Sequence, residues 1–374
     1  MLSQRGHKYS TGAKKTLENV INNLWDPDEN AAGFVSLGVA ENVIAEIKLA
    51  LPVSDVLNLG IDARRAIKLS MKMQTLQTHA FTYGDSFYGS KRLRSSIANF
   101  MNRCFHPHQP VKQEDVVATA GLTNSLEQMA YALGDHGDGF LIGRPYYTSL
   151  PKDFGSRAGD EIYALSVWQN PEVPDAVTFE SVLSIDTTGI IDPGLVHVLW
   201  GMSKDFGANG LRIGCIVSQR NTAFLDAVKA NSLFTYPPSI SDHITSTLLE
   251  DTSYTESYIR TNQLRLASNY AFATSFLKHH SIPYSPKVNA AFFLWVDLKP
   301  LFSKVATDEE RTKQGKDLSG AIMARLMAEK VFIANGESFA GEESGWFRIV
   351  FSQPREYVAE GLRRMVKAFS VEVK

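Results

Sequence analysis

Residues 196–218, VHVLWGMSKDFGANGLRIGCIVS, constrain the fold more than any other part of the chain. The apolar runs at the two ends, Val196–Trp200 and Ile213–Ser218, have the length and composition of buried strands. The link between them contains Lys204, Gly207, Gly210 and Arg212, and the fork of donors on this arginine suits a phosphate. Desolvation between core strands disfavours a charged lysine and lowers its pKa, and lysines of this kind form Schiff bases. A solvated lysine in an ordinary strand–loop–strand segment would give the same pattern, so both interpretations stay open.

Length, charge and cysteine content limit the class of protein. A chain of 374 residues normally forms two domains or one large α/β unit. The formal net charge of −2 leaves no basic excess to neutralise nucleic acid or an anionic membrane. Cys104 and Cys215 are far apart and lack metal-ligand spacing, which predicts a reducing compartment, no disulfide and no bound metal. Because the N-terminus lacks an apolar signal core and no apolar run is long enough to span a membrane, we expect a cytoplasmic protein that binds a small molecule.

Six further segments carry glycine, aromatic or charged residues at expected turns. Residues 81–91, FTYGDSFYGSK, do not form a nucleotide P-loop, because Ser90 stands where the lysine of that motif should be. Val116–Ala120 is an expected strand, and the glycine and helix start that follow it can bind an anion through free backbone amides. In chain order the segments are Gly38–Asn42, residues 81–91, Gly121–Asn124, Pro145–Tyr147, Asp160–Tyr163 and Gly345–Arg348.

Together with the Lys204 segment, these motifs resemble the fold-type I pyridoxal-phosphate (PLP) enzymes of the class I/II aminotransferase superfamily. Within that superfamily they are most similar to the 1-aminocyclopropane-1-carboxylate (ACC) synthases and their fungal relatives. The resemblance implies an α/β fold with an N-terminal helix and active-site segment (residues 1–45), a large PLP-binding domain with a mostly parallel central sheet (46–260) and a smaller C-terminal α/β domain (261–374). It also implies a homodimer in which Phe87 or Tyr88, in a turn before a helix at Ser90–Arg103, reaches the cofactor of the partner subunit.

The resemblance further implies which residues would contact the ring of the cofactor. Lys204 would carry PLP as the internal aldimine, and Tyr147 would stack on the pyridine ring. Asp160 would keep the pyridine nitrogen protonated, which makes the ring an electron sink. Tyr163 would donate a hydrogen bond to the phenolate oxygen of the cofactor and help to tune the imine.

The cofactor phosphate would be bound by Thr123, the amide of Asn124 and Arg212. The family usually has a phosphate-binding serine three residues before the lysine, and here that position is Gly201. Ser203, next to the lysine, is the hydroxyl that remains in this segment.

The substrate would be an α-amino acid whose carboxylate is clamped by Arg348 and which Glu41 contacts. The freed Lys204 amine would then remove the Cα proton of the external aldimine. ACC synthesis, β- or γ-elimination or substitution of the lyase type, and transamination share this opening, so an aminotransferase stays an alternative. Lys152 stands where ACC synthases have an arginine that handles S-adenosylmethionine, which argues against that particular substrate.

One departure from the family concerns the distance between two motifs. Tyr147 and Asp160 are only 13 residues apart, whereas two further βαβ crossovers of together about 60 residues are expected between the corresponding motifs. The missing part would include strands from the middle of the sheet and an Asn-Pro-x-x-Pro motif. Gly159–Asp160 therefore reads as the junction of an internal deletion, and a catalytically impaired or incomplete relative is a second hypothesis. In an alternative interpretation, Glu161–Val167 replaces an earlier strand, and then the roles of Asp160 and Tyr163 fail.

Overall fold

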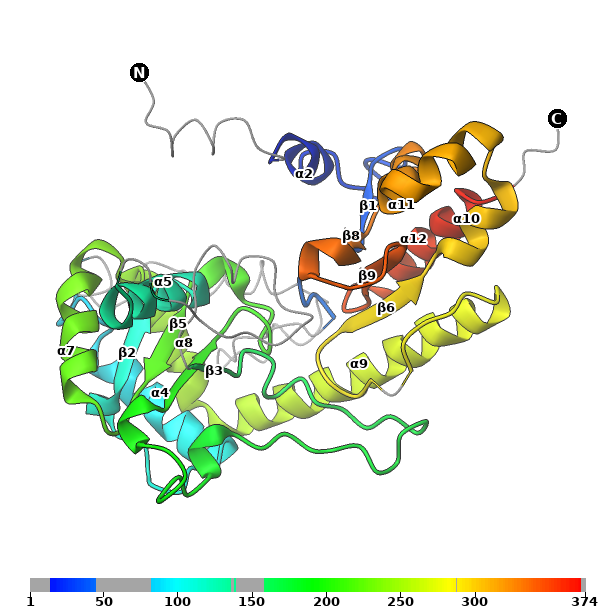
Figure 1. Cartoon of the computed structure of the whole chain (residues 1–374). Helices are drawn as coiled ribbons and strands as arrows, with labels where there is room; N and C mark the ends of the chain where they lie inside the picture. Colours follow the sequence, from blue (N-terminus) through cyan, green and yellow to red (C-terminus); the bar gives the residue numbers. More distant parts are fainter. Residues whose placement is uncertain (1–13, 45–81, 136–137, 139–157, 287, 371–374) are drawn as a thin grey trace. The chain divides into compact units, whose positions relative to one another are not determined.

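The computed structural model describes residues 14–44, 82–135, 138, 158–286 and 288–370 (Figure 1). The chain divides into two compact units. The large unit comprises residues 41–268 and 287–292, and the small unit comprises residues 1–40, 269–286 and 293–374. The long helix α9 (Thr252–His279) begins in the large unit and ends in the small unit.

A four-stranded sheet forms the centre of the large unit, as far as that unit is described. Its strands are β2 (Val116–Thr119), β3 (Ala158–Asp160), β4 (His197–Gly201) and β5 (Gly214–Val217). They lie in the order β2-β5-β4-β3, with β3 parallel to β4 and β5 antiparallel to both of its neighbours. Three of the four described strands therefore share one direction, which agrees with the predicted α/β fold. The parallel pairing of β3 with β4 brings the carboxyl ends of these two strands to the same edge of the sheet.

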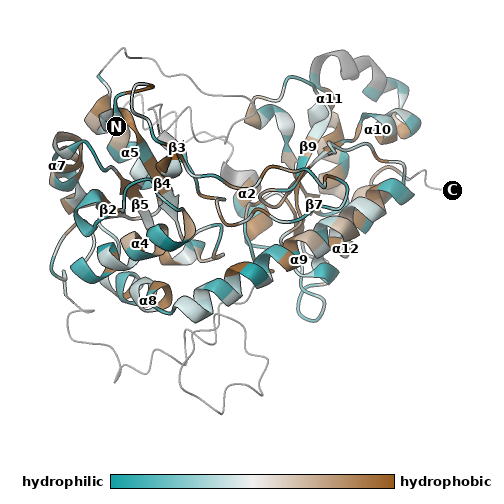
Figure 2. Cartoon of the chain, turned by 90° about the horizontal axis from the view of Figure 1, so that it is seen from below, coloured by the Kyte–Doolittle hydropathy of each residue, from teal (hydrophilic) through white to brown (hydrophobic). Residues whose placement is uncertain are grey.

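Helices cover both faces of this sheet. They are α4 (Lys91–Cys104) and α8 (Ser239–Glu250) on one face, and α5 (Leu122–Leu133) and α7 (Thr222–Asn231) on the other. Successive strand residues point to opposite faces, so Val198 packs with the first pair of helices and Leu199 with the second. Every residue of β2, β4 and β5 is buried, which explains why these strands read as continuous apolar runs. Figure 2 shows these hydrophobic strands between helices that also carry hydrophilic residues.

Local capping fixes the start of α4, which was expected near Ser90. The Ser90 Oγ accepts a hydrogen bond from the Leu93 N–H at 3.0 Å, as an N-cap residue does. Asp242 of α8 accepts from both the Ser90 N–H (2.8 Å) and the Ser90 hydroxyl (2.7 Å), which ties the two helices together. Short 3-10 helices in this unit span Gln113–Asp115, Val182–Ser184, Pro193–Leu195, Asn209–Leu211 and Ser232–Phe234.

The small unit contains a three-stranded antiparallel sheet and a parallel strand pair. The sheet has the order β6-β9-β8, with β6 (Phe293–Asp297), β8 (Ala334–Asn335) and β9 (Trp346–Val350). The pair consists of β1 (Val35–Ser36) and β7 (Val331–Phe332). Besides α9, the described residues of this unit form α2 (Lys14–Ile21), α10 (Lys299–Val305), α11 (Asp308–Ala328) and α12 (Arg355–Lys367), with a 3-10 turn at Gly336–Phe339.

The apolar positions Leu17, Val20, Ile21 and Leu24 predict an amphipathic helix over residues 12–25, and α2 confirms it over Lys14–Ile21. Val20 is buried, whereas Leu17, Ile21 and Leu24 are 40–49% exposed. The segment 161–167, considered as a replacement strand, instead forms turns, closed by bonds such as Ala164 N–H to Glu161 O (3.0 Å). The alternative in which it replaces an earlier strand is therefore wrong. None of the described helices combines the length and the apolar composition needed to cross a membrane.

Candidate functional site

Lys204 lies three residues after the last residue of β4, in a turn that begins at Met202. The turn is closed by hydrogen bonds from the Gly207 N–H to the Lys204 carbonyl (3.2 Å) and from the Ala208 N–H to the Met202 carbonyl (3.0 Å). Met202 and Phe206 are fully buried and anchor the turn to the core, whereas Lys204 is half-buried. Lys204 therefore sits on a backbone that is fixed on both sides.

Glycine is required at position 207 of this turn. Gly207 has a φ of +60°, and a Cβ there would come within 2.1 Å of the Asn42 carbonyl oxygen. The Asn42 side chain is buried and donates to the Lys204 carbonyl at 3.1 Å and to Asn262 Oδ1 at 3.0 Å. Asn42, which sequence reasoning did not assign a role, thus joins the segment after Gly38 to the lysine turn.

Glu41, predicted to contact the substrate, lies beside the same turn. Its Oε1 accepts a hydrogen bond from the Asn209 Nδ2 at 3.0 Å, and the residue is half-buried. The Glu41 carboxylate therefore contacts the segment between β4 and β5, and Asn42 contacts the same segment at Lys204.

Asp160 ends β3, directly beside β4 in register with Leu199. The surrounding protein raises the pKa of the Asp160 carboxyl by desolvation, although the residue as a whole keeps an exposed surface. The Ile162 N–H, which donates to Asp160 Oδ1 at 3.2 Å, and the positive charge of Lys204 both act in the opposite direction and lower this pKa. The sheet thus brings two predicted site residues, Asp160 and Lys204, within electrostatic reach of each other. Tyr163 follows in the next turn, with its ring edge-on to Phe292 at 5.3 Å between centroids.

Arg212 lies against the start of α5. Gly121, the residue before this helix, has a φ of +87°, and a Cβ there would come within 2.3 Å of the Arg212 Nη2. The guanidinium therefore lies on the Gly121 backbone, while its Nη1 donates to the Asn209 carbonyl at 2.9 Å. A guanidinium at a helix N-terminus adds a full positive charge to the partial positive charge of the helix dipole.

Two other predicted phosphate ligands lie at the same helix start. Thr123 is exposed in the first turn of α5, and its N–H has no acceptor within the helix. The Asn124 N–H donates to the Gly121 carbonyl at 3.0 Å. The Asn124 Oδ1 is buried and makes no hydrogen bond to the described residues. An unsatisfied carboxamide beside a cationic helix start is an observation that fits a polar ligand there.

The loss of the family serine at position 201 has a local structural explanation. Gly201 ends β4 opposite Gly214, and a Cβ on Gly201 would meet the Ile213 carbonyl oxygen at 2.7 Å. Any larger residue would push β5 away. Ser203 is buried, at 9% exposure, on the same turn as Lys204.

Arg348, predicted to bind the substrate carboxylate, belongs to the small unit and is described within it. It lies on β9 with its guanidinium between the rings of Phe293 and Phe339, each 4.3 Å from Arg348 Cζ. Its Nη2 donates to the Gly38 carbonyl at 2.9 Å, and the residue is 9% exposed. The planar fork is therefore held between aromatic faces, which suits bidentate recognition of a carboxylate.

The two aromatic residues considered for an intersubunit contact differ in their surroundings. Tyr88 packs against the core of the large unit with Arg94 over its ring at 4.6 Å. Phe87 is 38% exposed and forms an aromatic cluster with Tyr83 and Tyr236, at 6.1 Å and 5.4 Å between ring centroids. Tyr147 and Lys152 lie outside the described residues.

A string with the pattern Asn-Pro-x-x-Pro does occur, at Asn170–Pro174, but it follows Asp160 instead of preceding it. The Asn170 Nδ2 donates to the Val288 carbonyl at 2.7 Å, and its Oδ1 accepts from the Glu172 N–H at 3.0 Å. This asparagine is thus used in the local fold. The pattern was expected between Tyr147 and Asp160, where the sequence does not contain it.

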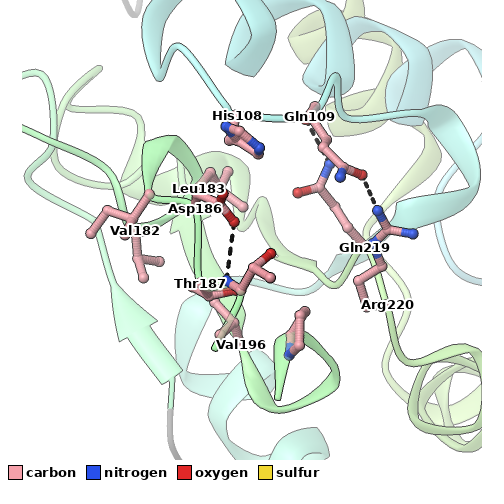
Figure 3. Close-up of a pocket in the computed structure, with 12 residues that line it drawn as sticks. His108, Gln109, Val182, Leu183, Asp186, Thr187, Val196, Gln219 and Arg220 are labelled. Atoms are coloured by element: carbon pink, nitrogen blue, oxygen red, sulfur yellow. Dashed lines mark hydrogen bonds between the residues drawn. The ribbon is translucent and has the colours of Figure 1, made fainter. Parts of the chain in front are cut away.

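A separate pocket lies at the opposite end of β4 from Lys204 (Figure 3). Its cavity volume is about 150 Å³, and its polar lining includes His108, Asp186, Gln219 and Arg220. It contains none of the predicted site residues. Within the described ranges, His, Cys, Asp and Glu side chains form no group of three or more that could hold a metal ion.

Comparison with known proteins identifies the family of this chain. The sequence matches Aminotransferase class I and II over residues 47–160 and again over residues 158–365. It is 27% identical to the probable aminotransferase aclI of Aspergillus oryzae, over 88% of this chain and 90% of that protein. It is 22% identical to a 1-aminocyclopropane-1-carboxylate synthase of Glycine max, over 94% and 83%, and that alignment has 424 positions, 50 more than this chain has residues.

Solved structures agree on the fold. A crystal structure of an archaeal alanine:glyoxylate aminotransferase superposes with a TM-score of 0.74 at 16% identity, covering 98% of both chains. Members of this family depend on PLP, and the sequence match covers more than half of the chain. The chain therefore belongs to the PLP-dependent class I and II aminotransferase family, and it is related to the ACC synthases within it.

Proposed function

We propose that the chain binds PLP at the turn after β4 and acts on an α-amino acid, with Lys204 as the residue that holds the cofactor and moves the Cα proton. The observation that carries this proposal is the electrostatic link between Lys204 and Asp160, at the neighbouring carboxyl ends of β4 and β3. When bound, PLP supplies an electron sink for the negative charge that develops at Cα. A carboxylate near the pyridine nitrogen supports that role because it favours the protonated nitrogen.

The phosphate of the cofactor would be held by Arg212 and the first turn of α5. The guanidinium against Gly121 supports this role, since it adds donors and charge where backbone N–H groups of the helix start lack partners within the helix. The unpartnered Asn124 Oδ1 and the Nδ2 of the same side chain exchange places when the amide rotates by 180°. In that orientation the N–H₂ group can donate to a phosphate oxygen. Thr123 and Ser203 are the hydroxyls available nearby.

The substrate would be bound through its carboxylate by Arg348, with Glu41 as a second contact. The fork of Arg348, held between two aromatic rings, supports recognition of a planar anion. Tyr163 would donate to the phenolate oxygen of PLP, and Tyr147 would stack on its ring. We infer a lyase or an elimination or substitution reaction of the ACC synthase type, with aminotransfer as the alternative suggested by the Aspergillus relative.

We also propose that the enzyme is a homodimer and that it works in the cytoplasm. The aromatic cluster of Phe87, Tyr83 and Tyr236, in which Phe87 and Tyr83 are exposed, supports an apolar contact with a second subunit. Of the two aromatics considered, Phe87 is the better candidate for that contact, because Tyr88 packs into its own core.

A specific observation favours a second candidate, an impaired enzyme. The family match breaks into two stretches that meet at residues 158–160, where the sequence predicts the junction of a deletion. The alignment with the soybean enzyme also contains at least 50 positions without a counterpart in this chain. In the part of the chain that the structure describes, β3 is an edge strand of the sheet and pairs with β4.

Cofactor binding tests both candidates. We would titrate the purified chain with PLP, follow the visible absorbance, reduce with borohydride and map the labelled peptide. The first candidate predicts one PLP per chain on Lys204, with no label in Lys204→Ala and normal labelling in the control Lys229→Ala. Label on another lysine would refute the assignment. Weak or absent binding that returns with a family-length insert between Gly159 and Asp160, together with a higher thermal midpoint, would support the impaired enzyme.

A further inference from the structure

A buried carboxylate follows Lys204 directly and has no part in the chemistry proposed above. Asp205 is 2% exposed. Its Oδ1 accepts from the Ser166 hydroxyl at 2.8 Å, and its Oδ2 accepts from the Leu165 N–H at 3.2 Å and from the Trp200 indole N–H at 3.1 Å. The carboxylate thus receives hydrogen bonds from two segments that are far apart in the sequence.

Asp205 accepts hydrogen bonds from the loop that carries Tyr163, another predicted site residue. This loop, residues 161–166, directly follows Asp160, the last residue of β3, and contains Tyr163. It continues the β3–β4 pairing through a bond from the Glu161 N–H to the Leu199 carbonyl (2.9 Å). Turn bonds inside the loop, such as Ser166 N–H to Tyr163 O at 3.0 Å, make it compact. A restraint on its last two residues therefore acts on the whole loop.

We propose that Asp205 is a positioning residue that locks the lysine turn (residues 202–208) to the 161–166 loop and so sets how the Lys204 amine faces Asp160 and Tyr163. The significance of this lock for catalysis rests on the proposed function. The lock itself is a property of the chain and exists without a cofactor.

The three donors around the carboxyl group give Asp205 a role beyond filling space. Burial raises the pKa of the Asp205 carboxyl to about 7, and the hydrogen bonds from Ser166, Trp200 and Leu165 oppose the rise. No ion pair joins Asp205 to a cation in the described parts of the chain, so its desolvation is offset mainly by these donors. An asparagine has the same size, but its N–H₂ group would face the hydrogen-bond donors that now bind the carboxyl oxygens, and two donors cannot bond to each other. Such a mismatch separates the two segments while it changes little volume.

Glu161 provides a matched control on the same loop. Its carboxylate also accepts two hydrogen bonds, from the Ser181 hydroxyl (2.7 Å) and the Val182 N–H (2.8 Å), and burial raises its pKa as well. It ties the loop to the 3-10 helix Val182–Ser184 and not to the lysine turn. Glu161→Gln therefore disturbs the loop to a similar degree without touching the proposed lock.

The first measurement is amide hydrogen exchange in the cofactor-free protein. Asp205→Asn should speed exchange in peptides covering residues 161–166 and 202–208 by about tenfold or more, the scale expected from hydrogen bonds to a charged group. Ser166→Ala, which removes one donor and keeps the charge, should do the same more weakly. Glu161→Gln should speed exchange at 161–166 and leave 202–208 unchanged. Protection at 202–208 that is the same in wild type and Asp205→Asn, or that falls equally in Glu161→Gln, overturns the proposal.

The second measurement uses the protein loaded with PLP. The observable is the pH midpoint at which the visible absorbance of bound PLP changes. This midpoint should shift by about one unit in Asp205→Asn and stay within about 0.2 units of wild type in Glu161→Gln. Only Asp205→Asn moves the Lys204 amine relative to its charged neighbours. Equal midpoints in the two variants overturn the positioning role. Failure of the proposed function is distinct, since a chain that binds no PLP still gives the exchange result.

Discussion

Acid destabilisation through His197 follows from the position of this residue at the start of β4. The side chain is 2% exposed, its Nδ1 lies 3.0 Å from the Ser218 hydroxyl, and its ring packs on Phe224 at 4.2 Å between centroids. Burial lowers the pKa of His197 from 6.5 to about 4. The folded protein therefore keeps the ring neutral while the unfolded chain takes up a proton below pH 6.5. The stabilisation is fully present above pH 6.5 and is lost as the pH falls toward 4.

The size of the effect follows from the two pKa values. At roughly 1.4 kcal/mol per pKa unit, lowering the pH from 8 to 4.5 removes about 2.5 kcal/mol from the free energy of unfolding. Asp205 acts with the opposite sign, because its pKa is raised from 3.8 to about 7 and its contribution is lost as the pH rises toward 7. The free energy of unfolding of the wild type therefore changes less with pH than the contribution of His197 alone would predict. The difference between wild type and a His197 variant removes the Asp205 contribution, provided the sites are independent.

The assay is urea unfolding of wild type and His197→Asn at pH 8 and at pH 4.5, followed by tryptophan fluorescence. Asparagine keeps a polar atom near Ser218 and cannot be protonated. The variant should be less stable at pH 8, and its deficit should shrink by about 2.5 kcal/mol at pH 4.5. His106→Asn is the control, because His106 is exposed and its left-handed backbone (φ +47°) suits asparagine. A deficit that is the same at both pH values within about 0.5 kcal/mol would refute the reasoning.

Three further predictions concern the site and the turn that carries it. Gly207→Ala should lower the free energy of unfolding by about 3 kcal/mol in urea unfolding, because its Cβ would meet the Asn42 carbonyl at a positive φ. Gly210→Ala is the control and should change this free energy little, because the space around Gly210 is open. Gly121→Ala should lower PLP affinity at least about tenfold in an absorbance titration, because the Cβ displaces the guanidinium that covers this residue; unchanged affinity would contradict the phosphate site. Arg348→Lys should raise KM for amino acids by about tenfold or more in steady-state kinetics and leave PLP affinity intact, and loss of PLP would argue against its role.

Local sequence patterns determined most of the secondary structure. The two apolar runs around Lys204 are strands β4 and β5, and the helix expected after Ser90 is α4, because strand burial and N-capping depend on neighbouring residues. Ordered motifs also identified the family and the PLP dependence, since each motif encodes a turn or a side chain at a fixed position.

The contacts between these segments were decided by the tertiary structure. The antiparallel insertion of β5 between β2 and β4 brings Arg212 back to the start of α5, which no local pattern specifies. Asn42 ends one of the motifs, but its contact with the lysine turn had no local signal, and Asp205 had none at all, because the partners of both residues lie far away in the chain.

The sequence by itself thus determined which residue types are available for PLP chemistry and on which strands and turns they lie. Only the tertiary structure decided which of them meet. Pairing across a sheet depends on strand order and register, and burial of a polar group depends on donors from distant segments. For Lys204 and Asp160 the parallel pairing of β3 with β4 is the physical reason that their charges interact.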